Sequence, residues 1–340
     1  MSLKRICVCG GGSLGHVTAG YLSARGKADV EVLTGHPGQW GSEVSVHVPE
    51  GIVLTGKLDS VSSSPADVIP SADVVLLCVP GFMIKDMLLK IRPYLRPDAY
   101  VGAVFSSTGF FFEAMSLLAP DQPLWGFQRV PFISRVVDYG HSANLLGYKS
   151  SFSIAVEHVG NEEKKAFSAW VSDSFGRPVK LLRNYLEASL TNSNPILHTS
   201  RLYSMFSSWR EGLFYQEQIP FYESWDAVSA EILISMDREF FDLLHVLPVT
   251  EGFLPTVLDY YESRDAVSLA AKLSGIEAFR GILSPMKLVS GGWIPDFSSR
   301  YFTEDFPFGL RYIYELGKEK GVAMPVISKV LSWGMSKVER

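Results

Sequence analysis

The sequence predicts an α/β domain with a doubly wound, mostly parallel sheet over residues 1–183, followed by an all-α domain over residues 184–340. Three observations support this prediction. Short apolar runs alternate with helical stretches in the first half, which is the pattern of βαβ units. A glycine-rich turn follows the first apolar run. In the second half, apolar residues such as Val228, Ile232 and Met236 recur at helical spacing, and we find no convincing strand.

Length, composition and charge narrow the functions to consider. A chain of 340 residues suggests two domains, and 47% hydrophobic with 20% charged residues is typical of a globular protein with sizeable cores. The formal net charge is −5 and no block of lysine and arginine occurs, so we expect no nucleic-acid partner. No run approaches the ~20 apolar residues of a membrane helix, so we expect no membrane anchor.

The cysteines indicate a reducing compartment. Cys7, Cys9 and Cys78 all lie in apolar runs, and the first two alternate with Ile6 and Val8. We therefore expect small buried core residues with free thiols. No second cysteine pair or histidine cluster accompanies them, so we expect no metal site. The N-terminus lacks the longer apolar core of a signal peptide, and we expect a cytoplasmic protein.

A glycine-rich turn near the N-terminus predicts a dinucleotide-binding site. An apolar strand over 6–9 precedes Gly10-x-Gly12-x-x-Gly15, and a helix is expected over 13–25. The first glycine makes the tight turn, the second lets the backbone approach a pyrophosphate, and the third lets the helix pack close to the strand. N–H groups at the helix start then face the phosphates. We predict a Rossmann domain whose cofactor contacts here are Gly10, Gly12, Ser13, Leu14 and Gly15.

The end of the next strand bears on the choice between NAD and NADP. NAD enzymes usually carry Asp or Glu about 20 residues past the glycines, where it binds the ribose 2′-hydroxyl. Here that position is Thr34, followed by Gly35 and His36. Glu31 lies too early in the strand. The missing carboxylate removes a repulsion against a 2′-phosphate, so NADP is favoured over NAD, although no arginine follows closely and His36 is equally consistent with an exposed turn residue.

Further strands end where the ligand crevice of a doubly wound sheet lies, at the carboxyl ends of the parallel strands. Val79 and Pro80 end the strand over 72–81 and should lie beside the cofactor. Thr108 and Gln128 follow the next two strands in the same way. The remaining predicted elements are a hairpin over 44–48 and 52–55, strands over 100–109, 124–132, 151–156 and 178–182, and a helix over 162–175.

Two stretches of the helical half carry candidate acid/base residues. In the first, Pro195 starts a helix with Asn194 as its N-cap, and His198 projects from the first turn. In the second, Asp305 lies near the start of another helix. Position alone favours a structural role for both: a half-buried histidine bonded to a backbone carbonyl, and an acid that favours the helix dipole.

Three motifs together resemble the octopine/nopaline (opine) dehydrogenase family. They are the glycine turn, the stretch Asn194-Pro195-x-x-His198, and the stretch Arg300-Tyr301-x-x-Glu304-Asp305-x-Pro307-x-Gly309, and the resemblance covers nearly the whole chain. It implies that His198 and Asp305 form an acid/base pair and that Arg300 binds an anionic group of cofactor or substrate. We add Asn194, Gln128 and Thr108 as weaker candidates for contacts with these groups.

The resemblance implies that an amino acid and an α-keto acid such as pyruvate condense to an imine, which is reduced with hydride from NAD(P)H. A histidine can accept and return the protons of this condensation, and a carboxylate on its other nitrogen fixes the tautomer. The glycine turn and His198 lie in different predicted domains, so we expect closure during the reaction. Which amino acid is used stays open, although Trp209, Tyr215, Tyr222 and Trp293 are candidates for an apolar pocket or for core positions.

Two alternatives remain. A reductase of a single keto acid, similar to ketopantoate reductase or glycerol-3-phosphate dehydrogenase, would share the two-domain plan but rely on a lysine in the helical domain; the lysines there begin at Lys272. A non-catalytic NAD(P)-binding redox sensor would not need His198, Arg300 and Asp305. The sequence leaves the oligomeric state open, a homodimer included, and Trp333 is only a weak indication of a helical interface.

Overall fold

The chain folds into two compact units, Met1–Thr191 and Asn192–Arg340, called here the first and the second unit. The structure is a computed structural model that describes residues 3–338, with the side chain of Thr108 outside the described part. The division falls after the short helix α6 (Tyr185–Ser189) rather than after residue 183, because α6 packs against strands of the first unit.

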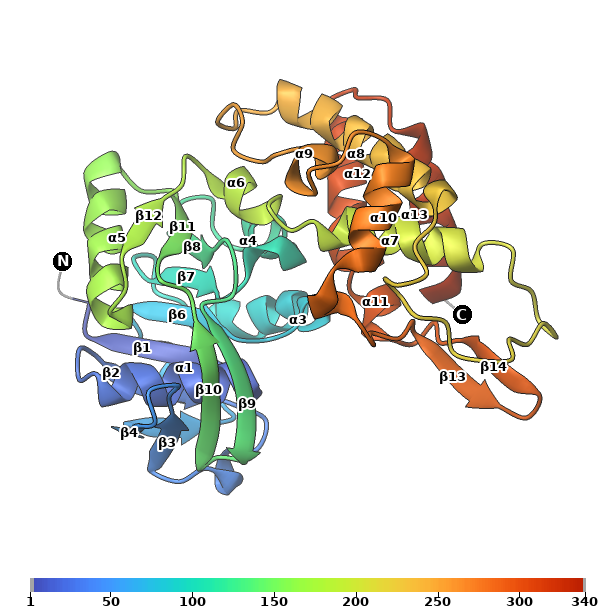
Figure 1. The fold of residues 1–340 in the computed structure, drawn as a ribbon. Helices are drawn as coiled ribbons and strands as arrows, with labels where there is room; N and C mark the ends of the chain where they lie inside the picture. The colour runs from blue at the N-terminus through green and yellow to red at the C-terminus, as the bar shows by residue number, and fades with distance from the viewer. Residues whose placement is uncertain (1–2, 339–340) are drawn as a thin grey trace. The chain divides into compact units, whose positions relative to one another are not determined.

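The first unit is built on an eight-stranded sheet in the order β12-β11-β8-β7-β6-β1-β2-β5 (Figure 1). All neighbouring strands are parallel except β8 and β11, which confirms the predicted doubly wound, mostly parallel sheet. Chain order reverses at β1, whose neighbours are β2 and β6, so the ligand crevice of such a sheet belongs at the carboxyl ends of these strands. The strands are β1 (Arg5–Cys9), β2 (Asp29–Leu33), β5 (Ser60–Ser62), β6 (Val74–Leu77), β7 (Tyr100–Ala103), β8 (Leu124–Phe127), β11 (Phe152–Glu157) and β12 (Val179–Leu181).

Helices cover both faces of this sheet. The apolar residues of α1 and α5 form one core with one sheet face, and those of α2, α3, α4 and α6 form a second core with the other face. Ile6 and Val8 belong to the first core and Cys7 and Cys9 to the second, as strand alternation requires. The helices are α1 (Ser13–Ala24), α2 (Pro65–Val68), α3 (Gly81–Ile91), α4 (Phe110–Leu117) and α5 (Asn161–Phe175).

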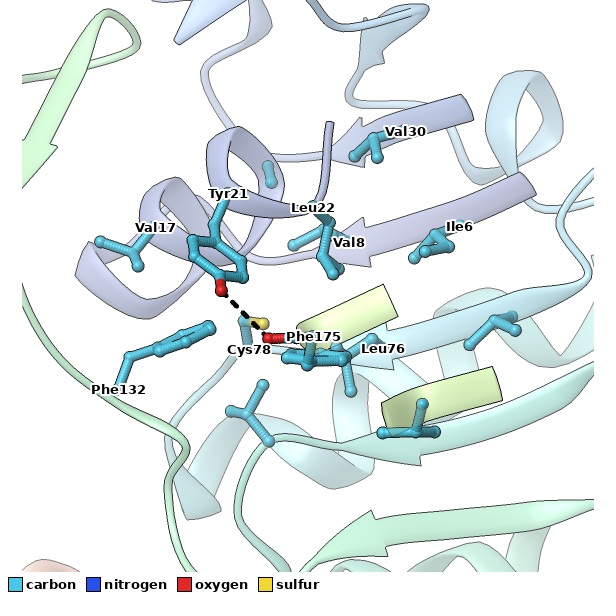
Figure 2. Packing of buried hydrophobic residues seen from close by; sticks show 14 of the residues in the cluster. Ile6, Val8, Val17, Tyr21, Leu22, Val30, Leu76, Cys78, Phe132 and Phe175 are labelled. Atoms are coloured by element: carbon cyan, nitrogen blue, oxygen red, sulfur yellow. Dashed lines mark hydrogen bonds between the residues drawn. The ribbon is translucent and has the colours of Figure 1, made fainter. Parts of the chain in front are cut away.

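The first core fixes the position of α1, the helix that begins at the glycine turn. Figure 2 shows Tyr21 of α1 among buried side chains that include Phe132 and Phe175. The Tyr21 hydroxyl donates a hydrogen bond of 3.0 Å to the carbonyl oxygen of Phe175 at the end of α5. All three cysteines are buried and free, as predicted.

A second, four-stranded sheet in the order β4-β3-β10-β9 packs on the other side of α1. The predicted hairpin is confirmed as β3 and β4, but β9 and β10 were not predicted. The reason is visible in β9, where Ser134 is buried while Ile133 and Val137 are exposed. A polar residue thus faces the core and apolar residues face solvent, which is the reverse of the usual strand pattern. The strands are β3 (Glu43–His47), β4 (Val53–Lys57), β9 (Phe132–Asp138) and β10 (Ser142–Tyr148).

The second unit is mostly helical, as predicted, with one departure. A two-stranded hairpin of β13 (Met286–Val289) and β14 (Gly292–Pro295) occurs where no strand was expected. Trp333 is partly buried, and its ring lies 5.9 Å from those of Phe302 and Phe306 within the same unit. The helices are α7 (Asn194–Phe206), α8 (Ala227–Val246), α9 (Val257–Tyr260), α10 (Ala266–Gly275), α11 (Arg300–Thr303), α12 (Arg311–Glu319) and α13 (Pro325–Val338), with a π-helical turn over Phe306–Leu310.

Membrane-spanning helices and metal-binding clusters are both absent from the described residues. Within residues 3–338, no helix has both the length and the apolar character needed to cross a bilayer. The same residues contain no group of three His, Cys, Asp or Glu side chains that could hold a metal ion.

Candidate active site

A cavity of about 480 Å³ lies in the first unit at the carboxyl ends of β1, β2 and β6. This is the crevice that the reversal of chain order at β1 predicts. Seven of the predicted cofactor contacts lie in its wall: Gly10, Gly12, Thr34, Gly35, His36, Val79 and Pro80.

The glycine turn leaves room for a pyrophosphate. Gly10 has φ +128°, and a Cβ there would lie 2.6 Å from the carbonyl oxygen of Cys78. A Cβ on Gly15 would lie 1.8 Å from the carbonyl oxygen of Gly10, so only glycine permits this approach of α1 to the turn. A Cβ on Gly12 would meet no atom within 4 Å, so open space faces this backbone. The turn and the N-terminus of α1 thus fit a dinucleotide phosphate.

Ser13, Leu14 and Gly15 begin α1 beside the cavity but are absent from its wall. The Ser13 hydroxyl accepts a hydrogen bond of 3.2 Å from the backbone N–H of Val136, and Leu14 packs on the apolar core. In this structure these residues hold the glycine turn in place.

His16, one residue further along α1, joins two cavity segments. Its Nδ1 lies 3.0 Å from the carbonyl oxygen of Gly12, and its Nε2 accepts a hydrogen bond of 2.7 Å from the backbone N–H of Gly140. Because Nε2 is an acceptor, Nδ1 carries the proton and donates to Gly12. The pKa of His16 is lowered, mainly by burial of the ring, so the neutral imidazole is favoured.

No carboxylate stands at the end of β2. Thr34 is 5% exposed, and its Oγ1 lies 3.3 Å from the Tyr139 hydroxyl. The carboxylate of Glu31 is buried, where it accepts hydrogen bonds from Ser60 and Ser71. His36 is exposed.

Part of the cavity wall was not predicted. Lys90 and Asp86 of α3 line it, and the Lys90 Nζ donates a hydrogen bond of 3.0 Å to the carbonyl oxygen of Ser63. Tyr139 also lines it, from the turn between β9 and β10. The helix after Pro80 could have indicated the α3 residues, because it begins at a predicted crevice position. Nothing in the sequence indicated Tyr139, because its two strands were not predicted.

The second unit brings together His198 and Asp305, which are far apart in the sequence. His198 lies in the first turns of α7, and its Nδ1 is 2.8 Å from Oδ2 of Asp305. Their side chains are 11% and 17% exposed. A carboxylate can only accept, so Nδ1 of a neutral His198 carries the proton, and Nε2 presents its lone pair. The structural interpretation of His198 predicted a half-buried ring bonded to a backbone carbonyl, but the partner of Nδ1 is the carboxylate of Asp305.

The local packing explains how the two motifs meet. Asp305 immediately precedes the π-helical turn Phe306–Leu310, which packs against α7. A Cβ on Gly309 would lie 2.6 Å from Cγ of Pro195, so glycine lets the first turn of α7 approach this closely. The two motif residues Pro195 and Gly309 therefore set the spacing between His198 and Asp305.

Aromatic side chains surround the imidazole. Nε2 of His198 lies 3.1 Å from the hydroxyl of Tyr222, and the ring of Tyr301 lies 4.8 Å from the imidazole. Burial, with a smaller contribution from the charge of Asp305, raises the pKa of both phenols, that of Tyr222 well above its usual range. Tyr222 was predicted only as a candidate pocket aromatic, and its bond to His198 carried no sequence signal.

The four candidates for anion contacts have different surroundings. The Arg300 side chain is 82% exposed, with Nη2 3.9 Å from Glu304. The Gln128 amide donates to Thr191 at 2.8 Å, which ties β8 to the end of the first unit. Asn194 is the first residue of α7 and the N-cap is Ser193, so the predicted N-cap was one residue late. The Thr108 side chain lies outside the described part of the chain.

Comparisons with known proteins agree with both halves of this description. Residues 181–338 match the model of the NAD/NADP octopine/nopaline dehydrogenase alpha-helical domain, and residues 6–104 match that of ketopantoate reductase PanE/ApbA. Octopine dehydrogenase of Pecten maximus is 26% identical, over 98% of this chain and 90% of that protein. Tauropine dehydrogenase of Arabella iricolor is 24% identical, over 96% and 90%.

Solved structures show the same fold. A complex of octopine dehydrogenase with NADH and L-arginine has a TM-score of 0.85 at 24% identity, over 99% of this chain and 90% of that one. Yersinopine dehydrogenase with bound NADP+ has a TM-score of 0.74 at 14% identity, over 99% and 91%.

Proposed function

We propose a reaction for this chain, which belongs to the opine dehydrogenase family. It joins the amino group of an amino acid to the carbonyl of an α-keto acid such as pyruvate. The resulting imine is then reduced with NAD(P)H as the hydride donor. The protein is accordingly an oxidoreductase acting on CH–NH bonds. The observation that carries the proposal is the 2.8 Å contact between His198 and Asp305 in the helical unit. The nicotinamide cofactor, when bound, supplies the hydride.

His198 and Asp305 would act as the acid/base pair of the condensation. The amino group enters as an ammonium and must lose a proton before its lone pair attacks the keto carbon. The carbinolamine then needs a proton on its hydroxyl, which leaves as water. The neutral imidazole of His198 can take the first proton and return the second, while Asp305 fixes the tautomer and stabilises the imidazolium.

Arg300 would bind a carboxylate or phosphate group. Its exposed guanidinium offers two parallel N–H donors to such an anion, and its weak contact with Glu304 at 3.9 Å does not consume them. Asn194, Gln128 and Thr108 are secondary candidates for the same groups. The Gln128 amide nitrogen already donates to Thr191 and to the carbonyl oxygen of Glu187, so any contact it makes would use its oxygen.

NADP would be preferred to NAD. The end of β2 presents the Thr34 hydroxyl instead of a carboxylate, and the nearby Glu31 is engaged with Ser60 and Ser71. Lys90 adds a positive charge to the cavity wall, although Asp86 lies in the same wall. A 2′-phosphate would therefore meet hydrogen-bond donors and a cation at this end of the cavity. We place the enzyme in the cytoplasm, where its three free cysteines would stay reduced.

The test is a matrix of NADPH or NADH, pyruvate or another α-keto acid, and a panel of amino acids. We expect oxidation of the cofactor only when both carbon substrates are present, with NADPH the better donor, and a secondary amine dicarboxylate as the product in mass spectrometry. Oxidation with a keto acid alone would instead favour a single-substrate reductase, to which the match of residues 6–104 also points. That match covers the cofactor unit only, while residues 181–338 match the octopine/nopaline model.

A further inference from the structure

The imidazole of His198 has no free nitrogen. Nδ1 is 2.8 Å from Asp305, and Nε2 is 3.1 Å from the hydroxyl of Tyr222. Because the neutral ring donates from Nδ1 to the carboxylate, Nε2 can only accept, and the Tyr222 hydroxyl must be the donor. A substrate proton therefore cannot reach Nε2 directly while this bond is present.

The Tyr222 ring is held firmly in place. It is 6% exposed and stacks on Phe279, with 4.2 Å between ring centroids, and on Trp225 at 6.0 Å. Phe221 lies edge-on to it at 4.9 Å. Removing the hydroxyl from Nε2 by a side-chain rotation would separate these stacked rings. A mobile cap that swings aside would not be packed in this way.

The backbone beside Tyr222 is anchored to the helix that carries His198. Arg201, one turn further along α7, is 3% exposed and donates from Nε to the carbonyl oxygen of Phe221 at 2.9 Å. Its Nη2 donates to the carbonyl oxygen of Ser224 at 2.8 Å. One helix thus fixes both the acceptor nitrogen and the segment that presents the donor hydroxyl.

We propose that Tyr222 is a catalytic residue which relays the proton between the substrate and His198. The inference rests on the proposed condensation. The Tyr222 oxygen donates its own proton to Nε2, and among the described residues no other hydrogen bond to this oxygen is present, so its lone pairs can accept a proton.

The relay conserves protons at each step. As the substrate ammonium gives a proton to the Tyr222 oxygen, the hydroxyl passes its own proton to Nε2, and the imidazolium is stabilised by Asp305. The reverse transfer protonates the carbinolamine hydroxyl, whose C–O bond breaks to release water. Burial holds the pKa of Tyr222 well above its usual range, so the phenol stays protonated between turnovers and acts by concerted transfer.

Tyr222→Phe removes the relay atom and keeps the stacked ring. We expect the rate of a single turnover of bound substrates to fall by about 10²-fold, with KM values and cofactor affinity little changed. The matched control is Tyr261→Phe, which removes a hydroxyl from another buried phenol of the second unit without touching Nε2. The control should retain most of the wild-type rate.

A second measurement, the dependence of the rate on deuterium content, would not change if the role of Tyr222 were only structural. In mixtures of H₂O and D₂O, a concerted transfer of two protons gives a curved dependence of the single-turnover rate on deuterium fraction. We expect this curvature in the wild-type enzyme and in Tyr261→Phe. Tyr222→Phe should give a straight line, because only one proton is then transferred in the rate-limiting step. Long-range ¹H–¹⁵N spectra should also show that Nε2 of His198 loses its hydrogen bond only in Tyr222→Phe.

The outcomes separate the relay from the proposed function. If no pair of an α-keto acid and an amino acid supports oxidation of NAD(P)H by the wild-type enzyme, the proposed function fails and this relay fails with it. If the wild type turns over both substrates with a straight-line deuterium dependence, the relay alone is overturned, whether or not the variant folds. A Tyr222→Phe enzyme as fast as or faster than wild type would likewise overturn it.

Discussion

The carboxylate of Asp305 determines which tautomer of His198 is present. It accepts from Nδ1 at 2.8 Å, which leaves the lone pair of Nε2 facing Tyr222. An amide in place of the carboxylate could present its NH₂ group to Nδ1 and favour the opposite tautomer. It would also remove the negative charge that stabilises the imidazolium.

We therefore expect Asp305→Asn to lower kcat by about 10³-fold while the fold is retained, since an amide fits the same space. Steady-state kinetics with both carbon substrates measures this. The control is Glu315→Gln, which changes an exposed carboxylate on α12 of the same unit and should leave kcat unaltered. An Asp305→Asn enzyme with more than a tenth of the wild-type kcat would contradict the role given to Asp305.

Thr34 is the residue at which cofactor preference can be tested. Its side chain ends β2 in the cavity wall, where a carboxylate would repel a 2′-phosphate and bind a 2′-hydroxyl. Thr34→Asp should raise the Kd for NADPH relative to that for NADH by on the order of tenfold or more, which corresponds to about 1.4 kcal/mol. Fluorescence titration of each cofactor gives the ratio.

Thr34→Asn is the matched control, because it has the size of Asp without the charge. It should change the two Kd values in the same direction. If Thr34→Asp binds NADPH as tightly as the wild type does, then the end of β2 does not contact the 2′ position of the ribose.

Among whole elements, the π-helical turn after Asp305 has the clearest function. Gly309 lies against Pro195 of α7, where a Cβ would approach Cγ of Pro195 to 2.6 Å. Proline is rigid, so Gly309→Ala should push α7 away from the turn and lengthen the contact between His198 and Asp305. Because small displacements of reacting groups are costly, we expect kcat to fall at least about tenfold.

Gly317→Ala provides the comparison within the same unit. A Cβ there would meet the end of the Met324 side chain, at 2.6 Å, which can move aside. It should lower the melting temperature slightly and leave kcat unchanged. Equal losses of kcat in both variants would mean that Gly309 matters only for general packing.

The start of α1 makes stability depend on pH through His16. Burial lowers its pKa, so the native state binds fewer protons than the unfolded chain. Its contribution to stability is complete above the unfolded pKa of about 6.5 and is lost as pH falls through the lower folded value. Protonation of Nε2 would also replace an acceptor by a donor facing the N–H of Gly140.

We expect His16→Gln to be less stable than wild type at pH 7 and to lose less of its melting temperature between pH 7 and pH 5. The difference between the two proteins at each pH is the quantity to measure. Burial raises the pKa of Asp237 to about 6, which affects stability in the opposite direction but equally in both proteins. A constant difference across this range would exclude the titration of His16.

The elements also show what the sequence could and could not predict. The glycine turn, β1 and α1 were predictable because local rules specify them: an apolar run, glycines where a Cβ cannot fit, and a helix start. Strand β9 was not, because its core-facing Ser134 and solvent-facing Ile133 reverse the usual alternation. Tyr139 was missed in consequence. Tyr222 was predicted only as a candidate pocket aromatic, because its hydrogen bond to His198 joins α7 to a separate loop and leaves no periodic pattern in the sequence.

At the scale of the molecule, the two units carry different parts of the proposed chemistry. Every residue in the wall of the cofactor cavity belongs to the first unit. His198, Tyr222 and Asp305 all belong to the second. Each set is held by contacts within its own unit, so a substitution in one set should leave the properties of the other intact.

His198→Ala should therefore bind NADPH and NADH with Kd values within about twofold of wild type, while kcat falls by about 10³-fold. Gly10→Ala should do the reverse. Its Cβ would lie 2.6 Å from the carbonyl oxygen of Cys78, in a backbone conformation that favours glycine, so cofactor affinity should drop by at least tenfold. The ¹⁵N resonances of His198 should stay as in wild type. A loss of cofactor affinity in His198→Ala as large as that in Gly10→Ala would show that cofactor binding depends on both units.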